Sequence, residues 1–144
     1  MKQEYKDLLL KDLCARLPYG VKLDCKWKTP GPNGNYCMVV KMNSFVLNQI
    51  YHIDDTDVPF NEVKPYLFPL SSMSREQKEE LENLGWYFDN FEIHNVSECL
   101  GTYREYVAHS DCFVLIDWFN KNHFDYRGLI EKGLAIDCTN LNIY

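Results

Sequence analysis

The residues best suited to chemistry lie in the segment HFDYRG, residues 123–128. His123, Asp125 and Arg127 alternate along it, so in an extended backbone the three side chains would face the same way. A carboxylate beside an imidazole or a guanidinium is a common arrangement in general acid–base and nucleophilic catalysis. The segment therefore offers a candidate catalytic set for a small hydrolase or nuclease-like enzyme, with or without a metal ion.

The same segment also fits a structural corner. A helix that ends near Asn122 needs a turn, and Gly128 can take a backbone conformation that other residues avoid. Asp125 and Arg127 can hold such a corner together through charge-assisted hydrogen bonds. We favour this interpretation, and the chain contains no G-x-S-x-G, Gly-rich phosphate loop or H-E-x-x-H motif that would indicate a known catalytic class.

Two further segments contain metal-ligand types without the required pattern. Residues 51–57, YHIDDTD, hold one imidazole and three carboxylates but lack the glycine and the spacing of a calcium loop. Residues 109–112, HSDC, would open a helix, where the side chains point in different directions, whereas a zinc site needs about four converging ligands. We therefore expect no metal and no cofactor.

Six cysteines are present, and none of them forms a C-x-x-C pair. The N-terminus, MKQEYKDLLLKDL, is charged and does not resemble a signal peptide. Reduced thiols in a soluble cytoplasmic protein are the expected state, with Cys14 and Cys112 as small core residues. No stretch reaches the roughly 20 apolar residues that span a bilayer, so we expect no membrane association.

The proline- and aromatic-rich stretch VKPYLFPL is the first candidate for contact with another protein. Prolines lower the cost of ordering a segment on binding, which singles out Pro65, Tyr66 and Phe68, together with Arg127 from the corner. The alternative is that these aromatic side chains are core, because a domain with 15% aromatic residues must bury most of them.

The charge distribution argues against nucleic acid as the main partner. The chain has a net charge of −6, with a net +4 in residues 1–41 and −10 in residues 42–144. Binding to phosphates needs clustered positive charge, which the second part lacks. The alternative is a weak basic patch on the following lysines: Lys22, Lys26, Lys28 and Lys41.

Local patterns predict the elements that must position these residues. Apolar residues about four apart predict a helix over 4–17, and period-two alternation predicts a strand over 21–27 that pairs with 36–42 across the TPGPNGN turn. The segment 44–55 fits neither period well. We expect an irregular extended connection over 63–74, because of its prolines.

The later part of the chain is predicted to be largely helical. Ser74 and Gln77 form a capping box that opens a helix ending near Gly85. An aromatic strand is predicted over 86–95, and a helix capped by Ser97 follows it. Ser110 is predicted to cap a central helix near 111–122 that packs against the sheet. After the corner, four apolar residues can return to the core: Leu129, Ile130, Leu134 and Ile136.

Three phrases of the sequence resemble a known grouping: KPYLFPLSSMSREQKEEL (64–81), DWFNKNHFDYRGLIEKGLAID (117–137) and DLCARLPYGVK near the start. They are similar to a family of small uncharacterised proteins of Bacteroides-type gut bacteria, their prophages and mobile elements. The resemblance covers about 60 residues and brings no catalytic or binding residues with it. It implies an accessory or phage-related role.

Together these patterns predict a single α+β domain over residues 1–144, with a small antiparallel sheet, an N-terminal helix and a largely helical C-terminal half. The leading functional hypothesis is a non-enzymatic interaction or regulatory module with an unidentified protein partner. An acidic surface could also imitate nucleic acid towards a DNA-binding protein. The alternatives are the hydrolase that uses His123, Asp125 and Arg127, and the weak nucleic-acid binder.

Overall fold

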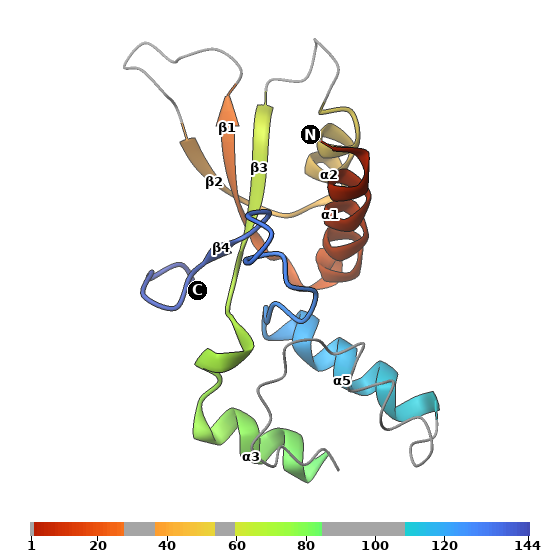
Figure 1. The fold of residues 1–144 in the computed structure, drawn as a ribbon, viewed down its shortest axis with the longest axis vertical. Helices are drawn as coiled ribbons and strands as arrows, with labels where there is room; N and C mark the ends of the chain where they lie inside the picture. Colours follow the sequence, from red (N-terminus) through yellow and green to blue (C-terminus); the bar gives the residue numbers. More distant parts are fainter. Residues whose placement is uncertain (1, 28–36, 54–59, 85–108) are drawn as a thin grey trace.

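The computed structural model describes residues 2–27, 37–53, 60–84 and 109–144. In these ranges the chain has an α+β fold (Figure 1). The α-helices are α1 (Gln3–Arg16), α2 (Ser44–Tyr51), α3 (Arg75–Asn83) and α5 (His109–Lys121). The strands are β1 (Lys22–Trp27), β2 (Cys37–Lys41), β3 (Phe60–Leu67) and β4 (Ile136–Asp137). The strand predicted over 86–95, the helix after Ser97 and the TPGPNGN turn lie outside the described residues.

The four strands form one sheet in the order β2-β1-β3-β4. β1 pairs antiparallel with both β2 and β3, with Leu23 opposite Val40 on one side and Pro65 on the other. β4 pairs parallel with β3, with Tyr66 opposite Ile136. The sheet is therefore mixed, not purely antiparallel as predicted, because the chain returns from α5 to run beside β3 in the same direction.

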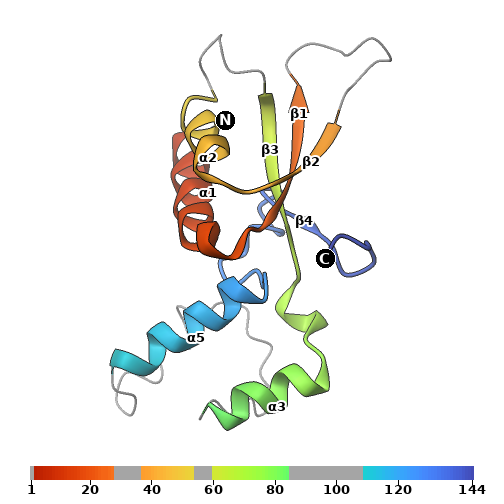
Figure 2. The ribbon, with the colours of Figure 1, turned by 180° about the vertical axis from the view of Figure 1, so that it is seen from behind.

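The main core lies between the sheet and the first two helices, which pack on one side of it (Figures 1 and 2). Period-two burial in β1 and four-residue spacing in α1 direct apolar side chains to this interface. Its fully buried members include Leu9, Leu13, Leu23, Ile50 and Val63. Leu129 and Leu134 also return to this core, as predicted, and Ile130 packs against it.

A second, smaller core surrounds α5, and this corrects the prediction that α5 packs on the sheet. α5 lies beyond one end of the sheet, near α3 (Figures 1 and 2). Its Trp118 and Phe119 pack with Leu81 of α3 and with Phe124 of the corner. Phe113 is 73% exposed, so the helix is not buried all round. It also begins at His109, so that Ser110 lies inside its first turn and not before it.

Sequence patterns predicted helix ends correctly where the capping hydrogen bonds join residues a few positions apart. The predicted capping box of α3 is present: Gln77 N–H donates to Ser74 Oγ (3.3 Å), and Ser74 N–H donates to Gln77 Oε1 (2.8 Å). Of the ambiguous segment 44–55, residues 44–51 form α2, and Asn43 Oδ1 caps this helix by accepting from Val46 N–H (2.9 Å). The N-terminal helix is confirmed as α1.

The prediction of an irregular connection over 63–74 was wrong for its first part, because Pro65 lies inside β3. Alternate residues of a strand direct their N–H and C=O groups to opposite edges. Leu67 C=O accepts from Cys138 N–H (3.0 Å), on the side away from β1, so Pro65 directs its nitrogen to that side as well. The missing N–H of Pro65 therefore costs the β1–β3 ladder nothing.

The C-terminal residue is docked between the two central strands. Tyr144 Oη accepts from Lys22 N–H (3.0 Å) and donates to Tyr66 C=O (3.0 Å). Lys22 and Tyr66 are the next pair of the β1–β3 ladder after Leu23 and Pro65. The Tyr144 hydroxyl therefore bridges the two strands at the position where their direct pairing ends. Burial raises the pKa of Tyr144 to about 12, so this hydroxyl stays protonated.

No helix in the described part of the chain is both long enough and apolar enough to cross a membrane.

Candidate functional site

The structure assigns Asp125 to the corner. Its Oδ1 accepts from Leu129 N–H (2.9 Å), and its Oδ2 accepts from Ile130 N–H (2.7 Å). Asp125 is 8% exposed, and both of its carboxylate oxygens accept from the backbone that follows. Gly128 lies between Asp125 and Leu129 in the sequence, and its φ of +67° is a backbone conformation that favours glycine.

Arg127 belongs to a buried ionic network at the end of α1. Its Nε donates to Asp12 Oδ1 (3.2 Å), and its Nη2 donates to Tyr126 Oη (2.8 Å). Asp12 also accepts from Arg16 at 2.7 and 3.1 Å, and both of these side chains are completely buried. Arg16 Nη2 then donates to Phe124 C=O (2.7 Å), which ties α1 to the corner across the sequence.

His123 occupies an unusual backbone position in the same corner. Its φ of +59° lies in the left-handed region, which costs a non-glycine residue energy. Its ring stacks on Tyr144 with centroids 4.2 Å apart, and its C=O accepts from Phe68 N–H (3.0 Å). Burial, with a smaller contribution from the positive charge of Arg16, lowers the pKa of His123 to about 4, so the ring is neutral at pH 7.

The alternation of His123, Asp125 and Arg127 does not bring their side chains together. The segment turns: Phe124 N–H donates to Phe119 C=O (2.9 Å), and Asp125 N–H donates to Phe68 C=O (2.8 Å). Each of the three side chains is held by different partners. The geometry therefore supports the structural interpretation of HFDYRG, and it offers no support for the hydrolase that this set suggested.

We expect the depressed pKa of His123 to make stability depend on pH. The unfolded chain takes up a proton below pH of about 6.5, whereas the folded protein resists it until about pH 4. The free energy of unfolding should therefore fall as the pH drops from 6.5 to 4. Urea unfolding at pH 7 and pH 5 measures this loss, and His123→Asn should reduce it, because asparagine tolerates the left-handed backbone and does not titrate. An equal loss in both proteins would contradict this assignment.

The proline–aromatic candidates are largely inside the fold. Pro65 and Tyr66 are buried in β3, and Phe68 is half-buried against Phe124 and Tyr144. They therefore offer little surface to a partner in this structure. Burial also raises the pKa of the Tyr66 hydroxyl above its usual value.

The lysines of the weak nucleic-acid hypothesis are partly engaged. Lys22 Nζ donates to Ile143 C=O, and Lys26 forms an ion pair with Glu62. Lys41 is exposed on β2, opposite Lys22, and Lys28 lies outside the described residues. The three described lysines share a sheet with acidic neighbours and do not form an uninterrupted positive surface.

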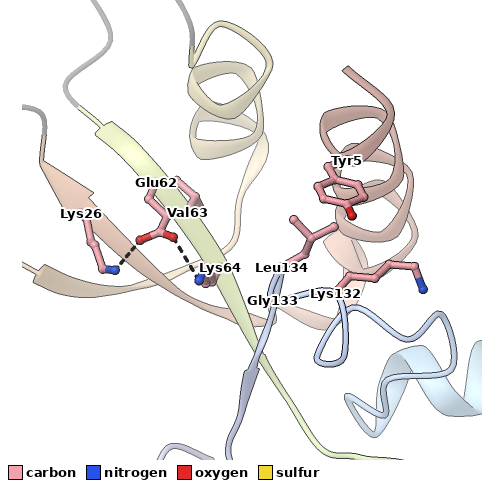
Figure 3. Close-up of a pocket in the computed structure, with 8 residues that line it drawn as sticks. All are labelled: Tyr5, Lys26, Glu62, Val63, Lys64, Lys132, Gly133 and Leu134. Atoms are coloured by element: carbon pink, nitrogen blue, oxygen red, sulfur yellow. Dashed lines mark hydrogen bonds and ion pairs between the residues drawn. The ribbon is translucent and has the colours of Figure 1, made fainter. Parts of the chain in front are cut away.

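A groove of about 510 Å³ runs along the edge of β3 (Figure 3). β3 contributes Glu62, Val63 and Lys64, and the neighbouring β1 contributes Lys26. On the opposite side lie Tyr5 of α1 and the turn before β4, with Lys132, Gly133 and Leu134. Four segments far apart in the sequence thus build one open site.

The groove is next to a stretch of the β3 edge with which β4 does not pair. β4 pairs only with Tyr66 and Leu67. Val63 directs its backbone to the same side as Leu67, because the two are an even number of residues apart. Its N–H and C=O therefore point towards the groove and away from β1.

The polar side of the groove is positive. Glu62 lies between Lys26 and Lys64, with 3.0 Å from its Oε1 to Lys64 Nζ (Figure 3). The hydrogen bond from Lys26, followed by Lys64, lowers the pKa of Glu62, so the carboxylate stays ionised. Across the groove, Lys132 Nζ donates to the C=O groups of Gly128 (3.2 Å) and Arg127 (3.4 Å).

Sequence reasoning missed this site, although part of its signal was present. Lys26 fits the nucleic-acid hypothesis alone; Glu62 directly precedes the stretch VKPYLFPL, and Lys64 lies within it beside the residues proposed for partner contact. The alternation of charged Glu62 and Lys64 with apolar Val63 is typical of a strand with one wet face. Nothing local indicates that Tyr5 and Leu134 lie opposite it.

The described cysteines are free: Cys14, Cys25, Cys37 and Cys138. Cys14 is exposed, which corrects the prediction that it is a core residue, and Cys112 lies where the structure does not describe side chains. Burial raises the pKa of Cys25 to about 12 and of Cys138 to about 11, so neither is a reactive thiolate.

Within the described ranges, no three His, Cys, Asp or Glu side chains are grouped so that they could hold a metal ion. The acidic segment 51–57 lies largely outside those ranges.

Comparisons with protein-family models, with curated proteins and with solved structures give no match. The site is therefore interpreted from its own geometry.

Proposed function

We propose that the protein is a non-enzymatic interaction module that binds an extended segment of another protein along the open edge of β3. The observation that carries this proposal is the groove beside Val63, where accessible side chains coincide with an edge of β3 that no other strand of the described residues pairs with. Extended peptides bind such edges by adding a strand: main-chain hydrogen bonds supply affinity, and alternate side chains supply specificity.

The resemblance of the sequence to small mobile-element and prophage proteins supports an accessory or regulatory role for this binding. We place the protein in the cytoplasm, where thiols such as the free Cys14 and Cys37 would stay reduced. The hydrolase alternative gains no observation in its favour, because His123, Asp125 and Arg127 are each held by other groups.

Val63→Pro tests the proposal, because it removes the N–H that points to the groove. Pro65 already occupies an equivalent position two residues on, so the β1–β3 ladder should survive. Heptapeptides are selected on the wild-type protein from a random library, and their affinities are measured by calorimetry. We expect Val63→Pro to weaken binding by about tenfold or more.

Val63→Ala is the matched control, since it trims the same side chain but keeps the N–H. It should bind the selected peptides more tightly than Val63→Pro does. Folding of both variants is checked by circular dichroism. Amide hydrogen exchange of Val63 in the wild-type protein gives an independent measure, and peptide should slow it. If no peptide is selected, or if the exchange of Val63 is unaffected by bound peptide, the proposal fails.

A further inference from the structure

The groove also constrains the chemistry of the bound segment; this inference rests on the proposed function and specifies its ligand. We infer that the groove takes an extended segment in which acidic and apolar residues alternate. The argument depends on the two faces of β3, on the charge of one of them and on the apolar surface of the other.

The two faces of β3 differ at the groove. Glu62 and Lys64 project to one face, whereas Val63 projects to the other and is 1% exposed in the main core. A strand added beside β3 has the same alternation, so every second side chain of the ligand lies on the face of Glu62 and Lys64. The remaining side chains lie on the face of Val63.

The charged face favours acidic residues in the ligand. Lys26 and Lys64 share the carboxylate of Glu62, and Asp24 of β1 lies opposite Lys64 on the same face of the sheet. The charged residues that line the groove, Lys26, Glu62, Lys64 and Lys132, have a net charge of +2. Asp24 beside them reduces this to +1, still positive in a chain whose total is −6. Opposite charges on neighbouring strands attract and like charges repel, so Glu or Asp fits here and Lys or Arg does not.

The other face favours apolar residues. Leu134 is buried in the main core together with Val63, and the half-buried Tyr5 packs against the same core. A ligand side chain that enters between them would extend this core outwards. Figure 3 shows Tyr5 and Leu134 across the groove from the Lys26–Glu62–Lys64 cluster.

The test uses three peptides of about seven residues that alternate Val with Glu, Thr or Lys, each with an acetylated and amidated end. We expect the Glu–Val peptide to bind at least about tenfold more tightly than the Thr–Val peptide, and the Lys–Val peptide to bind most weakly. Raising the salt concentration from about 0.05 M to about 0.5 M should remove most of this difference.

Charge reversal at the groove should invert the preference. Lys64→Glu should bind the Lys–Val peptide more tightly than the Glu–Val peptide. Lys78→Glu makes the same change in charge on the exposed surface of α3, away from the groove, and should leave the wild-type order intact. A Lys78→Glu protein that also inverts the order would overturn the inference.

The outcomes separate the two proposals. Equal binding of the Glu–Val and Thr–Val peptides, weakened by Val63→Pro, would keep strand addition and overturn the acidic preference. Absence of binding by all three peptides would overturn both. Sedimentation should show a monomer without peptide; a dimer that Lys64→Glu dissociates would assign the edge to a second copy of the chain and overturn the inference.

Discussion

Replacing Asp12 by alanine is expected to lower the free energy of unfolding by about 3–5 kcal/mol. Asp12 is the only acidic side chain in the network described here, and it compensates both Arg16 and Arg127. Arg16 is completely buried, so removal of Asp12 leaves a guanidinium charge without its counterion in the core. Urea unfolding followed by tryptophan fluorescence measures the change.

An exposed ion pair on α3 provides the control for Asp12→Ala. Arg75 and Glu79 have the same four-residue spacing and a similar distance, 2.8 Å against 2.7 Å, but their side chains are 88% and 54% exposed. Glu79→Ala should cost less than about 1 kcal/mol, because water screens and replaces the interaction. Similar losses for the two variants would mean that burial is not what makes Asp12 important.

Replacing Asp125 by alanine is expected to cost about 3 kcal/mol, because its two charge-assisted hydrogen bonds to the backbone would be lost. The N–H of Leu129, which is buried, and that of Ile130 would then have no acceptor. Thermal and urea unfolding measure the loss. Asp125→Asn should lose less, since the amide oxygen can still accept from one of the two N–H groups.

Asp137 is the control for Asp125, because it also accepts from backbone close by in the sequence. Its Oδ1 accepts from Thr139 N–H (2.9 Å) and Thr139 Oγ1 (2.7 Å), but the residue is exposed. Asp137→Ala should cost about 1 kcal/mol or less. If Asp125→Ala were as stable as Asp137→Ala, the structural account of the HFDYRG corner would be wrong and its candidate catalytic set would need to be tested directly.

The sequence predicted those elements whose stabilising contacts are local. The four-residue period of α1, the alternation of β1 and the capping box at Ser74 all depend on residues a few positions apart. The corner was also anticipated, because Gly128 and the charged Asp125 and Arg127 carry their own signals.

What the sequence did not predict depends on distant segments. In the sequence, Pro65 indicates an irregular chain. Only the pairing of β3 with β1 shows that the Pro65 nitrogen faces away from β1, where a proline is tolerated in a strand. β4 is two residues long, and its partner is about 70 positions earlier in the sequence. The burial of Asp12 has no local signal, because nothing near it in the sequence indicates that Arg127 forms an ion pair with it. The groove could not be predicted for the same reason, because it is built by segments far apart in the sequence.

The division of the buried side chains into two clusters has a consequence for how the molecule opens. One cluster lies between the sheet, α1 and α2, and the other lies around α5. Two features connect the clusters. β3 continues into Phe68, which packs against the second cluster, and Arg16 donates a hydrogen bond to Phe124 C=O. We expect such an arrangement to give two cooperative units, in which the smaller one around α5 unfolds and recloses at lower free energy while the sheet stays folded. The Arg16–Asp12 network then acts as the junction whose strength decides whether the two units melt together or one after the other.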